Sequence, residues 1–220
     1  MFSPNLPDLL SHIYDAHLIG AYTYIADLNP GASRQALLVV VDQLPFGVLK
    51  KQQSLSKALR KCVSSLKLFT REELRQSLDV FPIEFLDIIN DHTLIAGQDC
   101  LKSLEVDPAH LRHECEFYLR STILKLRENF AFAGASPKTL ITDSLPMVVS
   151  ISKYYLRLLG KPVPHTAAEA ITELRHVVQF DTKVFLDLLT LKSKVKPDMV
   201  FESYLTQLEA ISGQLDVLNA

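Results

Sequence analysis

The fold is decided by the stretch Gly31-Ala32-Ser33-Arg34-Gln35-Ala36-Leu37-Leu38-Val39-Val40-Val41-Asp42. Five apolar residues run from Leu37 to Val41, and three of them are β-branched. A glycine-containing turn precedes the run, and Asp42 with a Pro45-containing loop follows it. A continuous apolar run this short, bounded by turn-forming residues, predicts a strand buried on both faces of a sheet. Such a strand needs neighbours, so the flanking segments must supply more strands and the helices that cover them.

The segments on either side contain the expected patterns. Apolar residues at helical spacing predict a helix over residues 6–16, and β-forming residues predict a strand beginning near Leu18. Residues 48–65 are amphipathic and predict one helix, and residues 67–69 predict a short strand. Thr70 precedes Glu73 by three residues, which is a capping box that predicts a short helix through about Ser77.

Residues 81–89, Phe-Pro-Ile-Glu-Phe-Leu-Asp-Ile-Ile, predict a further strand. Pro82 fits only the first position of a strand or an edge strand. Period-two alternation places Asp87 on one face of this strand and Glu84 on the other. Residues 93–97 predict either a fourth short strand or a loop.

From Asp107 onward the pattern is helical throughout. Asp107-Pro108 and Ser136-Pro137 are N-caps followed by proline at the first helical position, and they predict a helix of about six turns and a second helix to Gly160, bent at Pro146. Three more helices are predicted, opened by Thr166 with Glu169, by Asp181 and by Pro197. The apolar stripe of the first of these five helices is expected at Leu111, Cys115, Tyr118, Thr122, Leu126 and Phe130.

The predicted fold class is therefore α+β, a small mixed β-sheet with flanking helices followed by an all-α helical bundle. The predicted domains are residues 1–105 and 106–220. No Gly/Ser-rich linker separates them, so we expect the two halves to pack on each other.

Composition excludes several classes of protein. The chain has 220 residues, 48% hydrophobic and 22% charged, with a formal net charge of −2, so there is no general electrostatic case for nucleic acid or an anionic membrane. We expect no signal peptide, because residues 1–8 lack a basic segment followed by an apolar one. We also expect no membrane span, because no apolar run approaches the roughly 20 residues that a span needs. Cys62, Cys100 and Cys115 are odd in number and widely spaced, which predicts buried thiols rather than disulfides or a zinc site and favours a cytoplasmic location.

Several charged clusters carry open alternatives. The basic face of residues 48–65 is either a solvated surface or a surface that faces phosphate groups; its cations are Lys50, Lys51, Lys57, Arg60 and Lys61. Arg112, Glu116 and Arg120 are spaced for ion pairs along one helix, or the arginines form a rim that faces an anion or the α/β half. His110 and His113 are three residues apart on one helix, and Glu114 is four beyond His110, a spacing that could hold two metal ligands. A third ligand is not identifiable and His-Glu-x-x-His is not matched, so we expect a solvated or hydrogen-bonded surface and no metal.

Three carboxylates are candidates for a metal-dependent reaction. Asp42 ends the opening strand, while Glu84 and Asp87 lie on the predicted strand 81–89. Two-metal phosphoryl transfer requires carboxylates brought together from adjacent strands. No Walker-type phosphate loop, dinucleotide fingerprint or nucleophile elbow is present in the sequence.

Two stretches, residues 69–88 and 97–127, together with the opening strand, resemble a branch of bacterial nucleotidyltransferase-domain proteins with a helical C-terminal domain (a polymerase-β-like fold). The resemblance covers roughly residues 17–130. In active members, a Gly-Ser turn is followed by an Asp-x-Asp pair that holds magnesium and the nucleotide triphosphate. Here Gly20-Ala21 stands near the place of Gly-Ser, and Ser33-Arg34-Gln35-Ala36 stands where the serine and acidic pair would be.

The resemblance therefore implies the fold and argues against the reaction, because only Glu84 matches a third carboxylate. It implies a catalytically degenerate protein with a binding or regulatory role, no catalytic residues and no resident metal or cofactor. Its partner would be another protein or a nucleotide, bound at the cleft between the halves. A further possibility is a purely structural subunit that forms a homodimer. The binding candidates are Ser33, Arg34, Asp42, Glu84, Asp87, Arg112 and Arg120. The alternative is an active enzyme that uses Mg²⁺ and a nucleotide triphosphate with relocated carboxylates at Asp42, Glu84 and Asp87.

Overall fold

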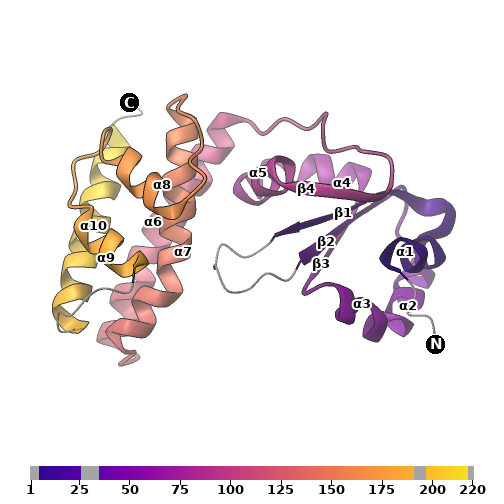
Figure 1. The fold of residues 1–220 in the computed structure, drawn as a ribbon, viewed down its shortest axis with the longest axis horizontal. Helices are drawn as coiled ribbons and strands as arrows, with labels where there is room; N and C mark the ends of the chain where they lie inside the picture. The colour runs from indigo at the N-terminus through magenta and orange to yellow at the C-terminus, as the bar shows by residue number, and fades with distance from the viewer. Residues whose placement is uncertain (1–4, 26–34, 191–196, 218–220) are drawn as a thin grey trace. The chain divides into compact units, whose positions relative to one another are not determined.

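The computed structural model describes residues 5–25, 35–190 and 197–217, and it divides the chain into two compact units, residues 1–107 and 108–220 (Figure 1). The first unit holds all four strands of the described residues, and the second is helical. The predicted α+β class, with a mixed sheet followed by helices, is confirmed.

The sheet has the strand order β3-β2-β1-β4. Its strands are β1 (Leu18–Ile25), β2 (Gln35–Val41), β3 (Leu66–Thr70) and β4 (His92–Gly97). β1 runs antiparallel to both β2 and β4, and β3 runs parallel to β2. The opening stretch forms β2 as predicted, and this strand is buried from Ala36 to Val41.

Helices cover both faces of the sheet (Figure 1). Alternation along β2 sends Leu37, Val39 and Val41 into one core cluster. That cluster includes side chains of α1 (Leu6–Tyr14) and α3 (Ser56–Cys62), with α2 (Phe46–Ser54) packed against it. The alternate residues, Ala36, Leu38 and Val40, enter a second cluster with α4 (Arg71–Gln76) and α5 (Pro82–Asn90). The side chains from Ala36 to Val41 are therefore packed alternately in the core on the two faces of the sheet.

The strand predicted at residues 81–89 is wrong, because these residues form the helix α5. Proline suits the first position of a helix, where its missing N–H would have no helical partner. The apolar residues Pro82, Phe85 and Leu86 also recur at helical spacing and are buried on one side of α5. The isoleucine-rich composition suggested a strand, but packing on the Leu38 side of the sheet favours the helix.

Other local predictions for the first unit hold in part. The single helix expected at 48–65 is interrupted at Leu55, which ends α2 and precedes α3. The capping box is confirmed, since Thr70 and Glu73 bond each other's backbone N–H at the start of α4. Residues 93–97 belong to strand β4, which resolves the strand-or-loop alternative.

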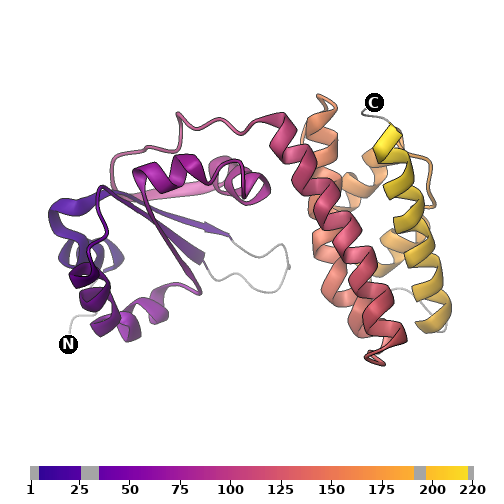
Figure 2. The ribbon, with the colours of Figure 1, turned by 180° about the vertical axis from the view of Figure 1, so that it is seen from behind.

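The second unit contains the five predicted helices (Figure 2). They are α6 (Pro108–Ala131), α7 (Pro137–Leu158), α8 (Ala167–Leu174), α9 (Lys183–Leu189) and α10 (Pro197–Val217). α6 packs against both α7 and α10, and Arg127 on α6 pairs with Glu209 on α10 at 2.8 Å. No helix within the described residues has the length and apolar character that crossing a membrane requires.

The predicted apolar stripe of α6 is only partly correct, because it fails at Phe130 and omits two buried residues. Leu111, Cys115 and Leu126 are buried, whereas Phe130 is 45% exposed. Leu119 and Ile123, which the stripe omitted, are also buried. Two neighbouring helices cover α6, so its buried strip is wider than one line of residues.

Cysteine accessibility tests the packing of this helix. Burial raises the pKa of the Cys115 thiol, and nearby Glu114 adds to the effect, while Cys62 is exposed at the end of α3. We expect Cys62 to react with a thiol reagent in the native protein and Cys115 to react only after unfolding. Peptide mapping of the labelled protein distinguishes them, and fast labelling of native Cys115 would contradict the packing.

Candidate functional site

The predicted carboxylates do not come together. Asp42 follows the end of β2, and its Oδ1 lies 2.8 Å from Nδ1 of His17. The hydrogen bond to His17 holds the pKa of the Asp42 carboxyl below its usual value. Both side chains are substantially exposed. Asp42 therefore forms a local pair that fixes the junction between His17 and the end of β2.

Glu84 lies on α5, not on a strand, and pairs with Lys67 of β3 at 2.7 Å. The pKa of the Tyr24 phenol is raised, first by burial and then by the charge of Glu84. Asp87 follows Glu84 by three residues, so the helix places both carboxylates on the same side.

Glu84 and Asp42 have different partners at different places along β2. Lys67, the partner of Glu84, lies opposite Leu38 of β2, and Asp42 follows Leu38 by four residues. At about 3.3 Å per residue, the backbone positions of Leu38 and Asp42 are about 13 Å apart. Within the residues that the structure describes, no three His, Cys, Asp or Glu side chains form a group that could hold a metal.

The remaining predicted residues fall in two places. Ser33 and Arg34 lie outside the described residues. Arg112 pairs with Glu116 at 2.9 Å, as the spacing predicted, and Arg120 is exposed on the same helix. None of these residues borders the pocket described next.

A pocket of about 200 Å³ opens in the α/β unit between α4 and the segment that follows β4. α4 contributes Arg71, Leu74 and Arg75, and the opposite wall consists of Gln98, Asp99, Cys100, Ser103 and Leu104. Leu74 is buried in the core, while both arginines are exposed. No described residue forms an ion pair with Arg71 or Arg75. The pocket therefore presents two uncompensated guanidinium groups beside polar side chains.

The hydroxyl of Tyr22 fixes the opposite wall to the sheet. It accepts a hydrogen bond from the Cys100 N–H at 2.7 Å and lies 3.0 Å from the Gln98 carbonyl oxygen. The Cys100 thiol is 3.2 Å away. Burial raises the pKa of Tyr22, so its proton is retained for donation to this wall.

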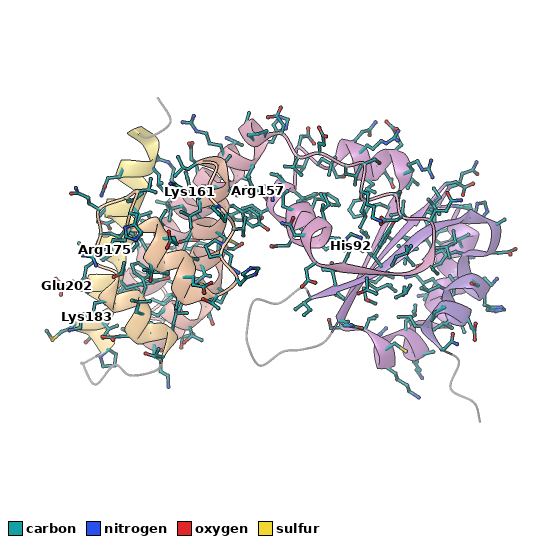
Figure 3. The ribbon with its side chains drawn as sticks, turned by 45° about the horizontal axis from the view of Figure 1, so that its top comes forward. His92, Arg157, Lys161, Arg175, Lys183 and Glu202 are labelled. Carbon is teal, nitrogen blue, oxygen red and sulfur yellow. The ribbon has the colours of Figure 1, made fainter. Side chains whose placement is uncertain are left out.

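Asp99 is held in place by several neighbours. Burial acts to raise the pKa of its carboxyl, but the Leu101 N–H bond, Lys102 and His92 together outweigh burial and lower the pKa. Lys102 lies 3.3 Å from Oδ2, and His92 Nε2 lies 3.8 Å from Oδ1. His92, labelled in Figure 3, packs edge-on against Tyr22 and bonds the Ile88 carbonyl through Nδ1. The wall therefore carries one negative charge, with the Lys102 ammonium beside it.

Two glycines allow this wall to approach the sheet. Gly20 on β1 faces Gly97 on β4, and a Cβ at Gly20 would meet the Gln98 carbonyl oxygen at 2.5 Å and the Tyr22 hydroxyl at 2.8 Å. Gly97 has φ +79°, which other residues rarely adopt, and a Cβ there would collide with the Ile19 carbonyl.

Sequence patterns did not point to this pocket. Arg71 and Arg75 are four residues apart, which brings them to one side of a helix, but nothing local shows that they meet residues 98–104. The position of residues 98–104 depends on a hydrogen bond between the Tyr22 hydroxyl and Cys100, which are 78 residues apart in the sequence. The chain matches no protein-family model and no curated protein, so the pocket is interpreted from its own geometry.

Removal of the Tyr22 hydroxyl tests the wall. In Tyr22→Phe the Cys100 N–H loses its partner, and we expect the free energy of unfolding to fall by about 1–3 kcal/mol in urea denaturation. Tyr14→Phe is the control, because its hydroxyl bonds only the half-buried Gln52 side chain, at 2.7 Å; its loss should cost no more than about 1 kcal/mol. Equal losses in the two variants would contradict a special role for Tyr22.

The glycine contact gives a second test. Gly20→Ala must displace the Gln98 carbonyl, and we expect a loss of about 1–3 kcal/mol in the free energy of unfolding. Gly47→Ala is the matched control, since a Cβ at Gly47 meets no atom within 4 Å, and a helical alanine there is neutral or slightly stabilising. A neutral Gly20→Ala would show that the wall does not lie against β1.

Proposed function

We propose that the protein is a nucleotidyltransferase-like binding protein that does not catalyse nucleotidyl transfer, and that its α/β unit binds a small anionic ligand in the pocket between α4 and residues 98–104. The observation that carries the proposal is the pair of arginines, Arg71 and Arg75, which border a pocket without an ion-pair partner among the described residues. The pocket replaces the cleft between the halves as the proposed binding site.

The absence of a catalytic role is supported by the carboxylates. The resemblance expects an acidic pair where Gln35 and Ala36 stand. Glu84 is paired with Lys67, and Asp42 is paired with His17. Two-metal phosphoryl transfer needs carboxylates gathered at one point, and the described residues include no group of three His, Cys, Asp or Glu side chains that could hold a metal.

The anionic ligand is supported by charge and size. Arginine presents a planar fork that matches the oxygens of phosphate and carboxylate groups, and two forks on one helix side favour an oxyanion. The pocket, at about 200 Å³, is smaller than the roughly 300–1,000 Å³ typical of drug-sized ligands. A small phosphorylated or carboxylated molecule, or the anionic end of a larger one, fits this size better than an enclosed nucleotide triphosphate. Three free thiols, Cys62, Cys100 and Cys115, support a reducing, cytoplasmic setting for this role.

A thermal-shift screen tests the proposal. We expect inorganic phosphate, sugar phosphates or nucleotides to raise the Tm without Mg²⁺, because a ligand at a hundred times its Kd stabilises by about 2.7 kcal/mol. The shift should disappear in the double variant Arg71→Gln, Arg75→Gln. It should persist in Arg157→Gln, an exposed arginine of the helical unit labelled in Figure 3.

Three outcomes would overturn the proposal. A shift that survives the double arginine variant would place the anion elsewhere. Magnesium-dependent nucleotidyl transfer that is lost in Glu84→Gln would instead establish the alternative enzyme. A screen without any shift across these anions would remove the ligand-binding role.

A further inference from the structure

Charge is distributed very unevenly along the first unit. Residues 43–71 contain seven Lys or Arg residues and no Asp or Glu, in a chain that has 25 acidic and 23 basic residues overall. Two of the seven have roles described above, since Lys67 pairs with Glu84 and Arg71 borders the pocket. The other five, Lys50, Lys51, Lys57, Arg60 and Lys61, belong to α2 and α3 and are called the basic surface below.

The packing of α2 and α3 explains why these cations face outward. The apolar side chains of the two helices pack on the core beneath β2 and α1; they are Val48, Leu55, Ala58, Leu59 and Val63. Lys50, Lys57, Arg60 and Lys61 are exposed, and Lys51 is half-buried. One side of this helix pair is therefore committed to the core, and the other side is cationic.

The basic surface has no compensating charge. None of its five cations forms an ion pair with a described residue. A solvated helix face usually interleaves charges of both signs, and like charges at neighbouring positions repel. Phe46, 69% exposed, lies beside one of these cations, with the Lys50 ammonium 5.1 Å from its ring centre. The basic surface therefore combines five positive charges with one exposed aromatic ring.

We propose that the basic surface of α2–α3 binds the phosphate backbone of single-stranded nucleic acid. Several lysines and an arginine on one face neutralise successive phosphates, which is the main source of sequence-independent affinity for nucleic acid. Phe46 lies beside Lys50, whose ammonium is over the ring, and its exposed ring is an aromatic surface on which a base can stack. The overall charge of −2 does not oppose this, because exposed charges act within about one Debye length, roughly 8–10 Å.

The same cations do not favour an anionic membrane. A helix that lies on a membrane needs an apolar stripe to insert below its basic face. In α2 and α3 the apolar stripe is already buried against the sheet, and the large exposed apolar residues there are Phe46 and Leu49, both in the first turn of α2. The nucleic-acid backbone, which requires charge and no insertion, fits this surface better.

Fluorescence polarisation with the full chain and a labelled 20-nucleotide RNA tests the proposal. Substitution of Lys50, Lys51, Lys57 and Lys61 by Gln should weaken binding at least about tenfold, and the slope of log K against log salt should become shallower by about 3. The control variant replaces four exposed lysines of the second unit, Lys125, Lys138, Lys161 and Lys183, by Gln; Lys161 and Lys183 are labelled in Figure 3. Both variants change the net charge equally, and the control should bind within about twofold of the unaltered chain.

A second variant keeps the proposal testable if the quadruple lysine variant fails to fold. Phe46→Ala removes an exposed ring, leaves the charge unchanged and should weaken RNA binding about fivefold or more through lost stacking. Equal weakening in the two lysine variants, or no binding at low salt, would overturn the proposal. Binding to phosphatidylserine vesicles without binding to RNA would also overturn it and assign the surface to membranes.

Discussion

The burial of β2 on both faces is the constraint on which the α/β unit depends. Its residues alternate between two core clusters, so each face of the sheet must be covered by helices. Antiparallel pairing with β1 and parallel pairing with β3 satisfy the backbone groups that this burial removes from water. α1 to α3 on one face and α4 with α5 on the other follow from that requirement. The sides of these helices that face away from the sheet can carry exposed charged residues.

The Tyr22 hydroxyl extends this constraint to the pocket. Tyr22 lies on β1 and is fully buried, so its position is set by the sheet. Its hydroxyl fixes Cys100 and Gln98, and the glycines at positions 20 and 97 permit the close approach. One wall of the pocket is therefore as rigid as the sheet, while the arginines on α4 stand on the other. Such an arrangement reduces the ordering cost of binding a small anion.

The sequence predicted those parts of the structure that depend on local signals. β2, the capping boxes at Thr70 and Thr166 and the five helices after Pro108 follow from short patterns and are present. α5 was mistaken for a strand because Ile83, Phe85 and Ile88 suit either element, and contact with the sheet decides between them. The pocket was not predictable, since α4 and residues 98–104 meet only through long-range contacts. The ion pair of Glu84 with Lys67 was not predictable either, because it requires residues 82–90 to form a helix packed on the sheet.

The charges of the first unit show how one fold can separate stability from binding. Two acidic residues form ion pairs within the unit: Asp42, after β2, pairs with His17, and Glu84 on α5 pairs with Lys67. The cations of α2 and α3 form no ion pair with a described residue, although the apolar sides of the same helices complete the core. Exposed like charges do not stabilise a fold, and their mutual repulsion slightly opposes it. Packing accounts for the apolar half of these helices, and binding of an anionic partner accounts for the cationic half.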